Sequence, residues 1–252
     1  MKGAAMKTYI FLLLPAILMV LQGCTPLGES IVRKANAEPN LAVASKPEPS
    51  SPALPTRSDA LLDPAARAIV DYYGPTIKSY AERYGFDWRL ILAIMKQESR
   101  FIPTAESKKG ASGLMQMMPL TSEEVSRVLS LEDMDYPRNN IHGGIFYLKQ
   151  LYSLFEGVEP ADRIKLTLAA YNAGIGRVYD AQDVAAYLHD NPTRWPAVRD
   201  ALLLLSRRYY TLHENVWQED KPRTGWFNGG RQTVAYVDAV MNYYDEYRLV
   251  LN

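Results

Sequence analysis

The segment Trp88–Ser99 reads WRLILAIMKQES and follows Asp87, a residue type that often caps the start of a helix. Its apolar face passes through Ile91 and Met95, and the same helical spacing places Glu98 next on that face. The segment therefore predicts a buried helix that carries one carboxylate on its buried face, near its C-terminal end.

The position of Glu98 has a chemical consequence. The C-terminal end of a helix is the negative end of its dipole, and burial also disfavours an ionised carboxyl. Both effects raise the pKa, and a carboxyl with a raised pKa can act as a general acid at neutral pH. The alternative is a structural one, in which Glu98 turns to solvent or pairs with Arg100.

The pattern around this segment is helical as well. The pair Asp63-Pro64 is a typical helix start, and no stretch shows the alternation typical of strands. We expect helices over 64–84 with a break at Gly74-Pro75, and over 88–99, 139–155, 160–173, 201–210 and 233–251. The sequence thus predicts one all-α domain over residues 59–252.

The first residues have the pattern of a secretion signal. Lys2 and Lys7 precede an uncharged apolar stretch over 9–20, which is too short for a comfortable membrane span. Gly23 and Cys24 then resemble the lipobox of bacterial lipoproteins, which implies cleavage after residue 23 and acylation of Cys24. Thr25 is not acidic, which by resemblance to lipoprotein sorting favours the outer membrane, facing the periplasm. An ordinary signal peptide with a chance cysteine is the alternative.

Residues 24–58 lack hydrophobic periodicity and contain six prolines among Ser, Ala, Glu and Asn. Such a segment buries too little apolar surface to offset the entropy of ordering it. We expect a lipidated, flexible tether in front of the helical domain.

Composition excludes several classes of function. Of the 252 residues, 28 are Lys or Arg and 28 are Asp or Glu, so the basic excess typical of nucleic-acid-binding proteins is absent. A single cysteine excludes an internal disulfide, and the three histidines show no metal-ligand spacing. We expect neither a cofactor nor a metal.

Two further motifs contain candidates for ligand binding. Residues 110–119 combine glycines and small residues with Gln116, whose amide both donates and accepts hydrogen bonds and so suits sugar hydroxyls and N-acetyl groups. Residues 169–174 place Tyr171 and Asn172 at the end of an apolar helix, before Gly174. A buried Gln116, and a core tyrosine with a satisfied hydroxyl, are the structural alternatives.

Taken together, the motifs resemble those of Slt-type lytic transglycosylases, which have a goose-type-lysozyme-like fold. The resemblance covers about residues 64–251 and is greatest to the catalytic domain of the membrane-bound lytic transglycosylase F group. The matching stretches, in the family's order, are Glu98-Ser99, Gly113-Leu114-Met115-Gln116, Asn140-Ile141 with Gly144 and Tyr147-Leu148, and Ala170-Tyr171-Asn172-Ala173-Gly174.

The resemblance implies a reaction and a set of roles. Glu98 would protonate the bond between N-acetylmuramic acid and N-acetylglucosamine in peptidoglycan, and a 1,6-anhydro-muramyl end would form. Tyr171 would hydrogen-bond Glu98, and Ser99 would support the helix end. The residues that would line the site or hold the sugar are Ser107, Gln116, Met118 and Asn172. Peptidoglycan, the membrane reached through the lipid, and other cell-wall enzymes are the implied partners.

The last predicted helix departs from the broader family. Residues 232–234 read Gln-Thr-Val where many members read Glu-Thr-Arg, although Tyr236 matches and is a further groove candidate. The indole rings of Trp195, Trp217 and Trp226 are candidates for stacking on sugars or for packing in the core.

Two other functions remain open at this point. A hydrolytic muramidase on the same fold would need an ordered water and usually a second acid, for which Asp133 and Asp135 are candidates. A non-catalytic, glycan-binding envelope lipoprotein is the second alternative.

Overall fold

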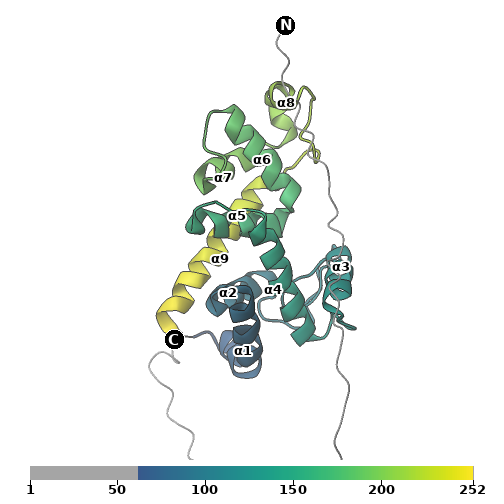
Figure 1. The fold of residues 1–252 in the computed structure, drawn as a ribbon, viewed down its shortest axis with the longest axis vertical. Helices are drawn as coiled ribbons and strands as arrows, with labels where there is room; N and C mark the ends of the chain where they lie inside the picture. The colour runs from purple at the N-terminus through teal and green to yellow at the C-terminus, as the bar shows by residue number, and fades with distance from the viewer. Residues whose placement is uncertain (1–61, 252) are drawn as a thin grey trace, which may run out of the picture. The chain divides into compact units, whose positions relative to one another are not determined.

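The computed structural model describes residues 62–251, so the predicted signal peptide (1–23), Cys24 and nearly all of the segment before the helices lie outside the described residues. Within 62–251 the secondary structure is helical apart from isolated bridges, which confirms the all-α prediction. None of the helices in this range is long and apolar enough to cross a membrane. The helices are α1 (Pro64–Tyr84), α2 (Trp88–Ser99), α3 (Pro119–Leu129), α4 (Pro137–Ser153), α5 (Pro160–Ala173), α6 (Ile175–Tyr187), α7 (Trp195–Leu203), the 3-10 turn η2 (Arg207–Tyr209), α8 (Tyr210–Trp217) and α9 (Gly230–Val250) (Figure 1).

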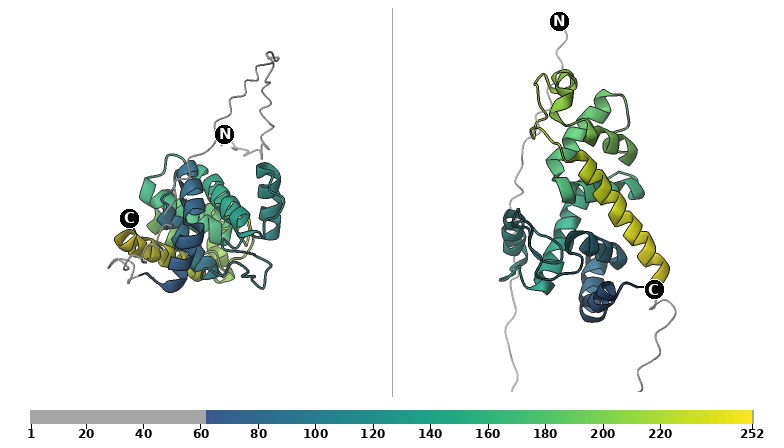
Figure 2. Two further views of the ribbon diagram at one scale, coloured as in Figure 1. Left: turned by 90° about the horizontal axis from the view of Figure 1, so that it is seen from below. Right: turned by 180° about the vertical axis from the view of Figure 1, so that it is seen from behind.

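Helix α2 is the buried helix that its sequence predicts. The Asp87 carboxylate accepts the backbone N–H of Arg89 and caps the first turn, and the residues from Leu90 to Met95 are buried. Helix α9 runs diagonally across the helical unit and packs against α2, α5 and α7 (Figure 2). The contact between α2 and α9 brings together segments about 140 residues apart in the sequence.

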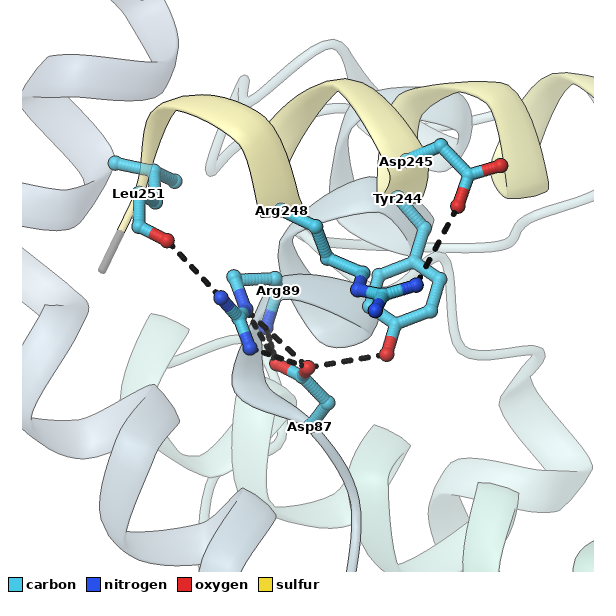
Figure 3. A network of polar contacts seen from close by, with 6 residues as sticks. All are labelled: Asp87, Arg89, Tyr244, Asp245, Arg248 and Leu251. Atoms are coloured by element: carbon cyan, nitrogen blue, oxygen red, sulfur yellow. Dashed lines mark hydrogen bonds and ion pairs between the residues drawn. The ribbon is translucent and has the colours of Figure 1, made fainter. Parts of the chain in front are cut away.

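A polar network fixes the start of α2 to the end of α9 (Figure 3). The Tyr244 hydroxyl donates to Asp87 at 3.0 Å, and Arg89 donates both to Asp87 and to the backbone carbonyl of Leu251. Because the two helices run in opposite directions, the other end of α2 meets the first half of α9. That end carries Glu98.

Helix α1 contradicts one prediction. It continues without a break from Pro64 to Tyr84, with Pro75 inside it. A proline inside a helix removes a hydrogen bond and costs about 3 kcal/mol or more. Here Ile69, Ile77 and Ala81, on both sides of the proline, are buried at helical spacing. Their packing holds the two halves in one helix.

The remaining predictions differ in accuracy. Helix α5 has its predicted bounds, and α4 begins two residues earlier than predicted. The helix predicted over 201–210 is wrong, because α7 ends at Leu203 and a 3-10 turn separates it from α8. Helices α3 and α6 were not predicted.

Candidate active site

Glu98 lies at the C-terminal end of α2, partly buried, and accepts a hydrogen bond from the Tyr236 hydroxyl of α9 at 2.6 Å. Burial raises the pKa of Glu98 to about 7, and the bond from Tyr236 acts in the opposite direction. The structural alternative fails, because Glu98 is not turned fully to solvent and no ion pair joins it to Arg100 within residues 62–251. At neutral pH this carboxyl is present in both its protonated and its ionised form.

The hydrogen bond to Glu98 comes from a different tyrosine than predicted. The Tyr171 hydroxyl donates to the backbone carbonyl of Met115 at 2.8 Å, so the predicted bond from Tyr171 to Glu98 is wrong. Tyr171 nevertheless lies near the acid: burial, and then the charge of Glu98, raise the pKa of Tyr171 well above its usual value. Tyr236, buried in α9, is the residue that orients the carboxyl.

A cavity of about 290 Å³ brings together four of the predicted ligand-binding residues. Gln116, Met118, Tyr171 and Asn172 line it, and Met118 is 44% exposed. The other residues of its wall are Met117, Thr121, Tyr147, Ala173 and Gly174. Glu98 itself is not one of the lining residues. Tyr171 is one of them and lies near Glu98, so we consider the acid and the cavity together as one candidate site.

The loop between α2 and α3 gives Gln116 its position. Gln116 has a positive φ of 47°, and its amide nitrogen donates to the carbonyls of Ala105 and Gly113, both at 3.0 Å. This bonding uses the amide hydrogens, so the amide oxygen is the group left for a ligand. Gln116 is therefore both a structural residue of the loop and a candidate ligand-binding residue.

The side chain of Asn140, in α4, binds the backbone of the same loop. Its side chain is fully buried, accepts the N–H of Met115 at 2.8 Å, and donates to the carbonyls of Ser112 and Met134. Gly113, with φ of 78°, packs so closely that a Cβ there would lie 2.5 Å from Asn140. The motif that contains Gly113 and Met115 therefore packs directly against the motif that contains Asn140. Asn140 belongs to a matching motif, but the sequence alone does not indicate this role in holding the loop.

Ser107, Asn172 and Ser99 also make hydrogen bonds within the protein. The Ser107 hydroxyl accepts the N–H groups of Lys109 and Ala111, and Ser107 is not part of the cavity wall. The Asn172 carboxamide accepts a hydrogen bond from Thr233 of α9 at 3.0 Å, while the residue stays exposed. Ser99 donates to the Met95 carbonyl, as a residue that supports the helix end should.

The side chains of three tryptophans, Trp195, Trp217 and Trp226, pack against other parts of the protein. Trp195 is buried at the start of α7, and the Trp217 indole donates to Asp183 at 3.0 Å. Trp226 packs near the ring of His213. These contacts favour packing over sugar stacking.

Comparison with known proteins shows which proteins this site resembles. Residues 75–191 match the family model of the transglycosylase SLT domain. This segment, just under half of the chain, is similar to the SLT domain. The matched residues include Glu98, Gln116 and Tyr171, whereas Tyr236 lies beyond them.

Curated relatives extend the similarity beyond the SLT domain model. The chain is 36% identical over 175 residues to a membrane-bound lytic murein transglycosylase F of Desulfosudis oleivorans, covering 69% of this chain and 36% of that protein. It is 35% identical to the protein of that name from Pseudoalteromonas translucida, covering 72% of this chain and 36% of that protein. The chain thus spans about a third of the length of these relatives.

Among solved structures, the SLT70 soluble lytic transglycosylase of Escherichia coli matches with 26% identity and a TM-score of 0.49, covering 71% of this chain and 24% of that one.

Proposed function

We propose that the chain is a lytic transglycosylase that cleaves the β-1,4 bond between N-acetylmuramic acid and N-acetylglucosamine in peptidoglycan. The observation that carries the proposal is Glu98, a partly buried acid with a pKa of about 7 that lies close to Tyr171 of the Gln116 cavity. The relatives named lytic murein transglycosylases support it.

In the proposed reaction one carboxyl serves twice. Protonated Glu98 gives its proton to the glycosidic oxygen as the bond to the muramyl C1 breaks. The ionised carboxylate then takes the proton of the muramyl C6 hydroxyl as its oxygen attacks C1. The product ends in a 1,6-anhydro ring, no water is consumed, and Glu98 returns to its protonated form. A pKa near neutrality suits a group that must both give and take a proton.

The surrounding residues have distinct parts in this proposal. Tyr236 orients the Glu98 carboxyl through its hydrogen bond. Gln116 and Asn172 hold the sugar beside the cleaved bond, and Met118 and Tyr171 shape the cavity wall. Ser107 acts through the loop whose backbone it binds. A second catalytic carboxylate is not needed, because the substrate supplies the nucleophile.

Product mass tests the proposal against its alternatives. Digestion of purified sacculi with the chain should release muropeptides that are one water lighter than hydrolysed ones. Products that contain the added water would contradict the proposal and favour a muramidase. For that alternative, Asp135 accepts a hydrogen bond from Ser112 and lines a different cavity from Gln116. Binding without any product would favour the non-catalytic lipoprotein.

We further propose that Cys24 is acylated and anchors the chain to the outer membrane, with residues 24–58 as the tether. The lipobox pattern and the membrane-bound names of the relatives support this location. Replacing Cys24 by serine should release the protein into the soluble periplasmic fraction, because the apolar stretch before it is too short to hold the chain stably. Thr25→Asp is the matched variant, and it should stay membrane-bound but leave the outer membrane. A Cys24→Ser protein that still fractionates with the outer membrane would contradict the proposal.

A further inference from the structure

A second and larger cavity, of about 540 Å³, lies against the loop between α2 and α3. It shares no lining residue with the Gln116 cavity. Its wall includes Ala105 and Gly113, the two residues whose carbonyls accept the Gln116 amide. The two cavities are therefore neighbours across one loop.

The larger cavity is acidic. Its charged lining residues are Glu106 and Asp135, and no lysine, arginine or histidine of residues 62–251 contributes to its wall. The Ser112 hydroxyl donates to one oxygen of Asp135 at 2.9 Å, which orients that carboxylate. The hydroxyl oxygen of Ser122, also in the wall, is buried and has no hydrogen-bond partner in the described part of the chain. Such a wall suits a ligand that carries a positive charge and hydrogen-bond donors.

The distance between the two cavities can be estimated from the loop itself. Glu106 pairs with Ser112, and Ser112 pairs with Met117, as antiparallel bridges. Glu106 and Ser112 line the larger cavity, and Met117 lines the smaller one. Neighbouring extended segments lie about 4.8 Å apart, so two spacings place the backbone of Glu106 roughly 10 Å from that of Met117. About three extended peptide residues span that distance.

We propose that the cavity of Glu106 and Asp135 binds the free ammonium group of the diamino acid in the peptidoglycan stem peptide. The inference rests on the proposed function, because the muramyl residue that carries the peptide would lie in the Gln116 cavity. The diamino acid is the third residue of that peptide, which matches the estimated reach. In a cross-link the same nitrogen is an uncharged amide and loses its attraction to the two carboxylates. The chain would therefore prefer strands whose stem peptides are not cross-linked through this amine.

Binding of two matched muropeptides tests the inference. Both are the disaccharide tripeptide with a 1,6-anhydro end, one with a free side-chain amine and one with that amine acetylated. Calorimetry with the full chain should give roughly fivefold tighter binding of the free amine, the upper end of the scale expected for exposed ion pairs such as those of Glu106 and Asp135. Equal binding of the two ligands to the unchanged chain would overturn the inference without reference to any variant.

Charge-neutral variants locate the effect. Glu106→Gln combined with Asp135→Asn should remove the preference, and the new amide keeps an acceptor for Ser112. Glu123→Gln combined with Glu132→Gln removes two exposed carboxylates outside the cavity wall and should keep it. A preference that survives the first pair, or disappears equally in the second, would overturn the inference. Formation of anhydro products is measured separately, so failure of the proposed function and failure of this inference are distinguishable.

Discussion

Replacing Glu98 by glutamine is expected to lower the cleavage rate at least about 100-fold, the scale of losing a general acid. Glutamine keeps the shape of the side chain and can still accept the hydrogen bond from Tyr236, but it has no proton to give to the glycosidic oxygen. The rate is measured on purified sacculi, with binding of soluble glycan fragments as the check that the site is intact. Residual turnover above about 10% in a folded variant would remove Glu98 from the role of acid.

The Glu98→Gln substitution should also change the free energy of unfolding by an amount that depends on pH. The pKa of Glu98 rises from its usual 4.5 to about 7 in the folded chain, so folding takes up a proton between these values. The contribution of Glu98 to the free energy of unfolding therefore falls as the pH rises from about 4.5 to about 7, and it stays low above that.

Glutamine has no charge to bury, so at about pH 8 Glu98→Gln should be more stable than the unchanged chain by roughly 2–3 kcal/mol. At about pH 4 the two should be nearly equal. Urea unfolding at both pH values measures this, and Glu124→Gln, an exposed position on α3, is the control that should show no such difference. An equal stability difference at both pH values would mean that folding does not raise the pKa of Glu98.

The position of Glu98 follows from the sequence because it depends on local rules. Asp87, the apolar spacing of α2 and the helix dipole all act within twelve residues, and together they place a carboxyl on a buried face. Burial is the main cause of the raised pKa, as the pattern predicts.

The partner of Glu98 depends on packing between distant segments. Tyr171 and Tyr236 are both matching tyrosines of the resemblance, and both lie near the acid. Which hydroxyl reaches the carboxyl is decided by how α9 crosses α2, a contact fixed at its other end by Asp87 and Tyr244. The available signal was Tyr236 itself, at a helical spacing from Tyr244 that puts both on the side of α9 facing α2.

The two incorrect helix predictions also arise from packing between segments that are distant in the sequence. Pro75 is a local signal for a break, and the burial of Ile69 and Ile77 in one core overrides it. The predicted helix over 201–210 joined two helices, because the apolar residues on both sides of the turn at Ser206 continue one pattern. Helix propensity predicts which segments are helical. Where such helices begin and end depends on the tertiary contacts of their terminal residues.

Replacing Asn140 by alanine is expected to destabilise the domain by about 3–5 kcal/mol. The change leaves the N–H of Met115 and the carbonyls of Ser112 and Met134 without this partner, and an unsatisfied buried polar group costs about 1–3 kcal/mol. Cleavage should also fall in the fraction that stays folded, because Gln116 follows Met115 directly in the loop that Asn140 clamps.

Asn139 provides the matched control. Its amide donates to the Asp133 carbonyl at 2.7 Å in an exposed setting, so Asn139→Ala removes a hydrogen bond that water can replace. That variant should stay within about 1 kcal/mol of the unchanged chain and keep its rate, as expected for exposed positions. Thermal unfolding and cleavage of soluble glycan are measured on both variants. If Asn140→Ala unfolds and cleaves like Asn139→Ala, the loop is held by other contacts, such as the bond from Tyr171 to Met115, and Asn140 only fills space beneath it.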